Sequence, residues 1–239
     1  MHILITGASN GIGLAVAKRF AASHKADVHL SICSRNLGAL AQARTEIEKL
    51  SPNAQIFASQ CDVSIAGDVE RFVAESEAKF GPVDLLVNNA GLGHFSQVLD
   101  MKSSDFDRVI ATNLRGVFLI TKAVLPKMRE QRSGTIVSIS SVAGKLAFKG
   151  GAAYCASKFG LRGLMQSLFL EVRDEKIRVI TIFPGSVDTN FFAAAGTQPF
   201  LSKNALTAED IADTVFASVS LPIHATVTEL DIRPTNPQR

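Results

Sequence analysis

The sequence contains few cysteines, and this scarcity excludes two classes of structure. Its three cysteines, Cys33, Cys61 and Cys155, are odd in number and have no CxxC spacing. Disulfide scaffolds and zinc sites are built from more cysteines at closer spacing. The five histidines are scattered without the spacing of metal ligands. We therefore expect no structural disulfide, no metal site and a reducing, cytoplasmic setting.

Charge of one sign and long hydrophobic runs are also scarce. The 239 residues include 25 basic and 22 acidic side chains, and the formal net charge of +3 is spread along the chain. Proteins that bind nucleic acid or membrane surfaces concentrate their basic residues in a patch or run. Hydrophobic stretches fall short of the roughly 20 uncharged residues that span a bilayer, and residues 117–120 run directly into Lys122. The composition predicts a globular protein with no nucleic-acid or membrane partner.

What the chain does have is a regular alternation of two patterns. Short β-branched runs, typical of buried strands, are separated by longer segments with apolar residues three or four apart. Such alternation produces a parallel sheet with helices on both faces. No Pro/Gly/Ser-rich linker divides the chain, so we expect one α/β domain over residues 1–239. The runs predicted as strands are 3–6, 28–34, 55–59, 85–88, 135–139, 178–183 and 227–232.

A glycine-rich loop follows the first predicted strand and leads into a helix. In open parallel sheets ligands bind outside the carboxyl ends of the strands. Gly7 permits a tight turn, Gly11 lets a pyrophosphate approach the backbone, and Gly13 lets helix and strand pack closely. The G-x-x-x-G-x-G spacing differs from the general dinucleotide fingerprint, and a tight turn without a ligand remains an alternative. The residues predicted to contact a dinucleotide here are Gly7, Ser9, Asn10, Gly11, Ile12 and Gly13.

Arg35 follows the second predicted strand and bears on the choice of dinucleotide. A free ribose 2′-hydroxyl usually meets an acidic residue at this place, whereas a 2′-phosphate requires a cation. The segment Ser34-Arg35-Asn36 has no acidic residue, and a guanidinium can form two hydrogen bonds to a phosphate. The pattern favours NADP(H) over NAD(H), unless Arg35 is only a solvated loop charge.

Tyr154 and Lys158 form a candidate catalytic pair. They are four residues apart, so on a helix they lie on the same face, and Tyr154 is the only tyrosine in the chain. A free phenol has a pKa of about 10, too high for acid–base catalysis at neutral pH. A nearby ammonium favours the phenolate, so we expect Lys158 to lower the pKa of Tyr154. Ser140 and Ser141 end the fifth predicted strand, where the sheet rule places a substrate contact.

Taken together, the motifs resemble those of the short-chain dehydrogenase/reductase family over nearly the whole chain. That family has a doubly wound Rossmann fold, and the resemblance implies an NADP(H)-dependent oxidoreductase that reduces a ketone or aldehyde to an alcohol, reversibly. The matching stretches are Thr6-Gly7-x3-Gly11-x-Gly13, Asp62-Val63, Asn88-Asn89-Ala90-Gly91, Asn113, Ser141, Tyr154-x3-Lys158 and Pro184-Gly185-x-Val187-x-Thr189.

The resemblance also implies roles for the matching residues. Tyr154 would be the acid/base for the substrate oxygen, and Ser141, rather than Ser140, would hydrogen-bond that oxygen. Lys158 would bind the nicotinamide ribose, and Asn113 would hold a water in the proton relay. Asp62 and Thr189 would lie by the adenine and the carboxamide. The other residues implied in cofactor binding are Val63, Asn89, Ala90, Gly91, Pro184, Gly185 and Val187, together with Tyr154 and Lys158.

The substrate and the oligomeric state are less narrowly predicted. Residues 184–205 lack periodicity, which indicates a binding loop, a lid or a partly disordered segment. The ending 227–235 resembles bacterial sepiapterin-reductase-like and 3-hydroxy-acid-dehydrogenase-like members. A dinucleotide-sensing regulator without catalysis is a further alternative, although such proteins usually lack the tyrosine or the lysine. Residues 106–125 are apolar on more than one face, which predicts either deep burial or a homodimer or homotetramer interface.

Overall fold

Seven parallel strands form one sheet in the computed structural model, which describes residues 1–23, 28–196 and 204–235. The strand order is β3-β2-β1-β4-β5-β6-β7, and each neighbouring pair is parallel. The strands are β1 (His2–Thr6), β2 (His29–Ser34), β3 (Gln55–Gln60), β4 (Leu85–Asn88), β5 (Gly134–Ile139), β6 (Ile177–Pro184) and β7 (Glu229–Ile232). This architecture confirms the predicted single-domain α/β fold with a doubly wound, seven-stranded sheet.

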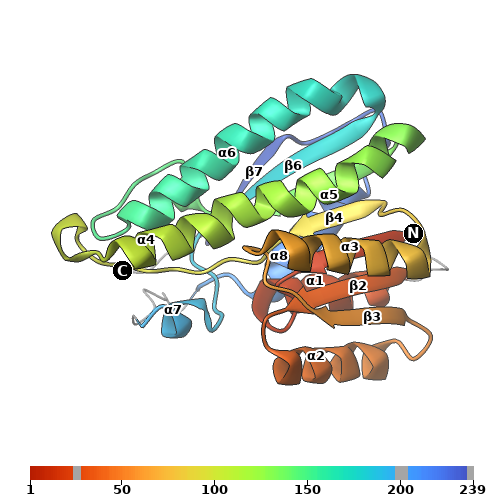
Figure 1. The fold of residues 1–239 in the computed structure, drawn as a ribbon, viewed down its shortest axis with the longest axis horizontal. Helices are drawn as coiled ribbons and strands as arrows, with labels where there is room; N and C mark the ends of the chain where they lie inside the picture. Colours follow the sequence, from red (N-terminus) through yellow and green to blue (C-terminus); the bar gives the residue numbers. More distant parts are fainter. Residues whose placement is uncertain (24–27, 197–203, 236–239) are drawn as a thin grey trace.

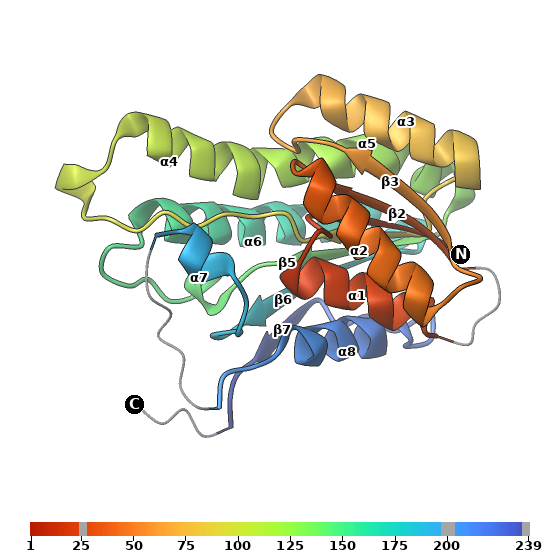
Figure 2. The same cartoon turned by 90° about the horizontal axis from the view of Figure 1, so that it is seen from below.

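Helices cover both faces of the sheet, as Figure 2 shows. On one face lie α1 (Gly11–Ala21), α2 (Leu37–Leu50) and α8 (Ala208–Val219); on the other lie α3 (Ala66–Phe80), α5 (Gly116–Gln131) and α6 (Ala152–Val172). The central strands are buried along their whole length, because a sheet covered on both faces needs continuous apolar runs rather than alternation. Each face has its own hydrophobic core, and the carboxyl edge of the sheet lies between them.

A long helical run crosses one face beside α6 (Figure 1). It joins α4 (Ser103–Ile110), a π-helical turn at Ala111–Arg115 and α5. Residues 103–131 are long and apolar enough to pass a length-and-composition criterion for a membrane span, a criterion that buried core helices also meet. The buried side chains of α5, including Val117, Ile120, Val124 and Met128, pack into the hydrophobic core on the sheet.

The segment predicted as an irregular loop over residues 184–205 contains more structure than expected. Strand β6 extends to Pro184, and Val187 forms a parallel bridge with Leu206. A short helix, α7 (Phe191–Ala194), follows. The part of this prediction that concerns residues 197–203 lies outside the described residues. The last strand begins at Glu229, two residues later than predicted.

Candidate active site

The carboxyl ends of β1 and β4 lie side by side at the point where the chain order of the sheet reverses. From β1 the chain continues to β2 and β3 on one side, and from β4 it continues to β5, β6 and β7 on the other. Connections that leave in opposite directions open a crevice at such a switch point. The glycine loop follows β1, and residues 89–91 follow β4, so these two predicted segments meet there.

The glycine loop has a backbone that side chains would disrupt. Gly7 and Gly11 have φ values of +66° and +53°, which L residues rarely adopt. At Gly13 a Cβ atom would lie 2.4 Å from the Asn89 Nδ2 atom and 2.5 Å from the Gly7 carbonyl oxygen. Gly13 therefore lets the start of α1 pack directly on the turn, as the sequence predicts.

Asn89 holds this loop from the neighbouring strand. Its Nδ2 atom donates to the carbonyl oxygens of Thr6 and Gly7, both at 3.0 Å. The Thr6 hydroxyl in turn accepts from the backbone N–H groups of Asn89 and Ala90, each at 3.0 Å. The family resemblance implies Asn89 in cofactor binding, and in the structure its side chain braces the glycine loop. No local pattern could have indicated this, because the partners are more than 80 positions apart.

The beginning of α1 has the donor set that an anion requires. Asn10 occupies the N-cap, and its side chain makes no capping hydrogen bond. The first N–H groups of a helix have no partner within the helix, and the helix dipole favours negative charge there. Ser9, Gly11 and Ile12 are partly exposed at this turn. The loop thus fits a pyrophosphate by shape and by its N–H donors.

Arg35 lies at the exposed end of β2, and within the described ranges no ion pair of its guanidinium is found. Its carbonyl oxygen accepts from Gln60 Nε2 at 2.8 Å, which fixes its backbone to β3. The side chain of Asn36 accepts from Ala39 N and caps α2. Arg35 therefore presents its charge near the N-terminus of a helix, an environment suited to a phosphate.

Asp62 and Val63 follow β3 and differ in exposure. The Asp62 carboxylate accepts from the N–H and the hydroxyl of Ser64, at 2.9 and 2.7 Å. Val63 is buried, and its side chain fills the space that a Cβ atom on Gly116 would need. Asp62 is therefore partly exposed in the turn after β3, whereas the Val63 side chain packs against α5.

Tyr154 and Lys158 lie on the first two turns of α6, and both are nearly buried, with exposed fractions of 8% and 6%. The Lys158 Nζ atom donates to the Ile139 carbonyl oxygen at 2.9 Å and lies 5.8 Å from the centre of the Tyr154 ring. Burial lowers the pKa of Lys158 to about 8. The helix thus places the two side chains together, as the i,i+4 spacing predicts.

The predicted lowering of the Tyr154 pKa is wrong for the chain by itself. Burial raises the pKa of Tyr154 to about 12, and a hydrogen bond from Ser141 offsets only part of that increase. Desolvation disfavours the phenolate, while the ammonium of Lys158 is directed at a carbonyl of β5. At neutral pH the phenol therefore keeps its proton.

Ser140 and Ser141 point to different surroundings. The Ser141 hydroxyl accepts from Ala143 N at 3.2 Å and contacts Tyr154. Ser140 is buried, and its oxygen lies 2.8 Å from the position of a Cβ atom on Gly144, with no hydrogen-bond partner among the described residues. The geometry groups Ser141, not Ser140, with the tyrosine.

Asn113 lies in the π-helical turn between α4 and α5 and is fully buried. Its Nδ2 atom donates to the Leu92 carbonyl oxygen and the Ser157 hydroxyl, and its Oδ1 atom accepts from Leu92 N. A Cβ atom on Gly91 would lie 3.4 Å from Asn113 Oδ1 and 3.9 Å from Lys158 Nζ. Asn113 therefore joins the loop after β4 to α6, and both of its side-chain donors are used.

The segment after β6 reaches back to the glycine loop. Gly185 N donates to the Ile232 carbonyl oxygen at 2.8 Å, which extends the pairing of β6 with β7 beyond Pro184. The Thr189 Cγ2 atom lies 3.4 Å from the position of a Cβ atom on Gly11. Val187 is buried. Thr189 thus lies against the turn that is suited to a pyrophosphate.

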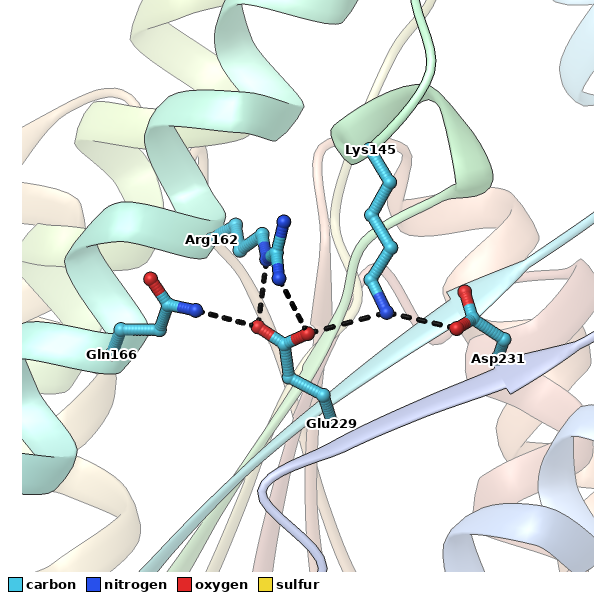
Figure 3. Close-up of polar contacts among 5 residues, drawn as sticks. All are labelled: Lys145, Arg162, Gln166, Glu229 and Asp231. Atoms are coloured by element: carbon cyan, nitrogen blue, oxygen red, sulfur yellow. Dashed lines mark hydrogen bonds and ion pairs between the residues drawn. The ribbon is translucent and has the colours of Figure 1, made fainter.

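A network of charges that sequence reasoning missed supports the segment after Ser141 (Figure 3). Glu229 of β7 accepts from Arg162 through both oxygens, at 2.7 and 2.9 Å, and from Gln166 at 2.8 Å. The Lys145 Nζ atom bridges Glu229 and Asp231, at 3.2 and 2.8 Å. Hydrogen bonds, chiefly from Arg162, lower the pKa of Glu229. The network ties β7, α6 and the turn after Ser141 together.

We expect Glu229→Gln to lower the melting temperature by about 2–4 °C, the shift that roughly 1 kcal/mol produces in a chain of this size. The substitution keeps the volume of the side chain and removes the charge that Arg162 and Lys145 share. Differential scanning calorimetry measures the shift. Glu175→Gln is the control, because it removes a similar two-oxygen pair with Arg129 at the surface; an equal shift in both variants would contradict the stated role of the network.

The fold and the crevice define the class of protein. A glycine loop at the switch point of a doubly wound parallel sheet is the arrangement of Rossmann-fold dinucleotide-binding proteins. The family model for short chain dehydrogenases matches residues 1–199. The chain therefore belongs to this family of oxidoreductases. The resemblance predicted from the motifs is confirmed.

Three similar proteins show how the family relation extends along the chain. Sepiapterin reductase from Chlorobaculum tepidum is 35% identical over 98% of this chain and 96% of its own length. The bovine 3-ketodihydrosphingosine reductase is 36% identical over 80% of this chain, which spans 58% of that protein. The structure of an alcohol dehydrogenase from Thermococcus sibiricus, complexed with 5-hydroxy-NADP, superposes with a TM-score of 0.89 at 31% identity and covers 100% of this chain and 97% of its own.

Proposed function

We propose that this oxidoreductase uses NADP(H) to reduce a ketone or aldehyde to an alcohol, reversibly, with Tyr154 as the acid/base. One observation carries the proposal: Tyr154 and Lys158 are buried together on α6, and Tyr154 contacts Ser141 at the carboxyl end of β5. A small-molecule carbonyl compound is then the substrate. NADPH consumption with a panel of ketones and diketones tests the proposal, and absence of NADPH-dependent turnover with every compound would contradict it.

Each catalytic residue has one task in the proposed reaction. The bound nicotinamide cofactor supplies the hydride. Ser141 hydrogen-bonds the carbonyl oxygen of the substrate, and Tyr154, whose phenol is protonated at neutral pH, gives its proton to that oxygen. Lys158 binds the ribose hydroxyls of the nicotinamide. The Asn113 side chain holds the loop after β4 against α6 and so keeps Gly91 beside Lys158. Because both of its side-chain donors are used, the main chain of Asn113 contacts the relay water in this proposal.

The residues along the crevice fit a dinucleotide. The glycine loop and the start of α1 would hold the pyrophosphate with N–H groups, while Asp62 would lie by the adenine. Thr189, which lies against Gly11, would contact the nicotinamide side. The 5-hydroxy-NADP in the archaeal alcohol dehydrogenase structure supports NADP(H) as the cofactor.

Arg35 carries the preference for NADP(H) in this proposal. We expect Arg35→Ala to raise the KM for NADPH about 10- to 100-fold, because a charge-assisted hydrogen bond contributes roughly 1.5–3 kcal/mol. The KM for NADH should not change, since NADH has no 2′-phosphate. Steady-state kinetics with both cofactors measure the difference.

Arg44→Ala is the matched control for Arg35. Arg44 lies on α2 and pairs with Glu48 at 2.7 Å on the helix surface. Its removal takes away the same charge without reaching the end of β2. A preference of the wild-type enzyme for NADH, or equal effects of the two variants, would contradict the role given to Arg35.

Exposed apolar side chains on α5 and α6 bear on the oligomeric state of the protein. Phe118 on α5 and Phe159 on α6 are 45% and 43% exposed, and Leu170 on α6 is exposed as well. Apolar side chains of this size on adjacent helices support a homodimer or homotetramer in which α5 and α6 meet their copies. Light scattering measures the mass of this assembly in solution.

The three free, buried cysteines are compatible with a cytoplasmic setting.

Two other substrate assignments and one non-enzymatic role remain as alternatives. The name of the relative from Chlorobaculum tepidum favours a pterin side-chain ketone, and a 3-hydroxy acid is the other candidate from the C-terminal resemblance. The different substrate names of the similar proteins mean that family membership alone does not select among them. A dinucleotide-sensing regulator would need no buried Tyr154–Lys158 pair, so the presence of that pair supports an enzyme.

A further inference from the structure

Two phenylalanines, Phe95 and Phe191, contact the Tyr154 ring, and two more, Phe148 and Phe192, pack on them. Phe95 comes from the segment after β4, Phe148 precedes α6, and Phe191 and Phe192 lie on α7. These segments are far apart in the sequence, and the fold brings them to the carboxyl side of β4, β5 and β6. We call these five rings the aromatic cluster.

A continuous series of ring contacts links the members of the aromatic cluster. The Tyr154 centroid lies 5.7 Å from that of Phe95 and 5.6 Å from that of Phe191. Phe95 in turn lies 5.8 Å from Phe148 and 6.2 Å from Phe192, and the latter ring is stacked on it. These separations fall within the range in which aromatic pairs attract one another beyond simple burial.

The rings pack against the backbone at two glycines, Gly93 and Gly151, where a side chain would collide with them. A Cβ atom on Gly151 would lie 2.5 Å from Phe148 Cζ. On Gly93 it would lie 2.9 Å from Phe95 Cζ and 3.0 Å from Phe191 Cζ. A side chain at Gly93 would displace Phe95 and Phe191, which contact Tyr154, and a side chain at Gly151 would displace Phe148, which packs on Phe95. The two glycines therefore leave the space that the rings of the aromatic cluster occupy.

The four phenylalanines of the cluster belong neither to the two large cores on the sheet nor to the proposed chemistry. Phe148 is 47% exposed, and Phe95, Phe191 and Phe192 are partly exposed, whereas the two large cores on the sheet are buried. The reaction uses only the Tyr154 hydroxyl, which is the one polar side-chain atom that the five rings carry. A substrate whose carbonyl reaches this hydroxyl lies beside Phe95 and Phe191, the rings packed on Tyr154.

We propose that the aromatic cluster selects the substrate, and that the preferred substrate is a ketone with a flat, uncharged ring next to the carbonyl group. The proposal rests on the proposed function, because it places the carbonyl at Tyr154. A flat ring replaces the contact between Phe191 and Tyr154 with new contacts of the same kind, whereas a short alkyl chain offers no π-face. Each aromatic contact contributes about 0.5–1.5 kcal/mol, which corresponds to roughly 2- to 10-fold in kcat/KM.

The first test compares two 1,2-diketones with the same reacting group. In 1-phenylpropane-1,2-dione one carbonyl bears a ring, and in hexane-2,3-dione it bears an alkyl chain. With NADPH, we expect the wild-type enzyme to prefer the aryl diketone by roughly tenfold or more in kcat/KM. Phe148→Leu and Phe191→Leu should each reduce this ratio about 2- to 10-fold, chiefly through KM.

Phe57→Leu is the matched control. Phe57 lies in β3, the edge strand farthest from β6, and packs on Phe72 of α3. The same chemical change there should leave the ratio as in the wild type. A wild-type enzyme that turns over both diketones equally, or that prefers the alkyl compound, would overturn the proposal. So would equal losses for both substrates in the Phe148 and Phe191 variants.

A second test needs no turnover. The chain has no tryptophan, so Phe192→Trp introduces a single indole into the aromatic cluster. In the presence of NADP⁺, 1-phenylpropan-1-ol should change the emission of this tryptophan at lower concentration than hexan-3-ol. If NADPH consumption fails with every ketone and diketone of the panel but the aryl alcohol still binds preferentially, the proposed function is wrong and the recognition proposal holds. Equal binding of the two alcohols would overturn the recognition proposal even if turnover occurs.

Discussion

Tyr154→Phe is expected to lower kcat for carbonyl reduction by about 10²- to 10⁴-fold, the contribution of general acid catalysis. The substitution removes the one hydroxyl that can protonate the substrate oxygen and keeps the ring. Because burial raises the pKa of Tyr154 to about 12, the wild-type phenol holds its proton at neutral pH and is ready to donate it. Single-turnover measurements with NADPH isolate this step from product release.

The same variant should bind NADPH almost as tightly as the wild type. The Phe ring retains the contacts with Phe95 and Phe191, and Lys158 keeps its hydrogen bond to the Ile139 carbonyl. Fluorescence titration of NADPH measures the affinity. Ser140→Ala is the control, since its hydroxyl faces Gly144 rather than the phenol. Wild-type turnover in Tyr154→Phe would eliminate the catalytic assignment.

Gly13→Ala should weaken NADPH binding by roughly tenfold or more, the effect of about 1.4 kcal/mol or greater. The new Cβ atom would lie 2.4 Å from Asn89 Nδ2 and 2.5 Å from the Gly7 carbonyl oxygen, and the second of these is backbone. Overpacking of this kind costs about 1–3 kcal/mol, so the melting temperature should fall by several degrees as well. The glycine loop and the Asn89 brace must separate, and the N–H groups move away from the pyrophosphate.

Gly163→Ala provides the matched control. Gly163 lies within α6 and is exposed, and a Cβ atom there would meet nothing within 4 Å. Alanine favours a helix over glycine by about 0.8–1.0 kcal/mol, so this variant should be slightly more stable and bind NADPH normally. Calorimetry and cofactor titration compare the two variants. Unchanged affinity in Gly13→Ala would show that the close packing at the loop has no part in cofactor binding.

Several parts of the fold and of the site follow from local sequence signals. The seven strands were predictable because a sheet covered on both faces requires continuous apolar runs. Gly7, Gly11 and Gly13 were predictable because only glycine tolerates such a turn and such packing. The Tyr154–Lys158 pairing follows from helical geometry alone.

Other features depend on partners that are distant in the sequence. The brace formed by Asn89 and the Glu229 network join residues more than 60 positions apart. Helix α7 escaped prediction because four residues are too few for a periodic signal. The direction of the Tyr154 pKa shift was misjudged, because spacing reveals the neighbouring lysine but not the loss of solvent.

The sequence by itself determined the class of the fold, the dinucleotide loop and the identity of the residues proposed for catalysis. Each of these depends on short-range geometry: strand and helix periodicity, backbone freedom at glycine, and side chains one helical turn apart. Only the tertiary structure decided how strongly burial holds the phenolic proton, and that Phe95 and Phe191 pack on the Tyr154 ring. Burial and ring contacts arise when separate segments pack together, and no local pattern encodes them.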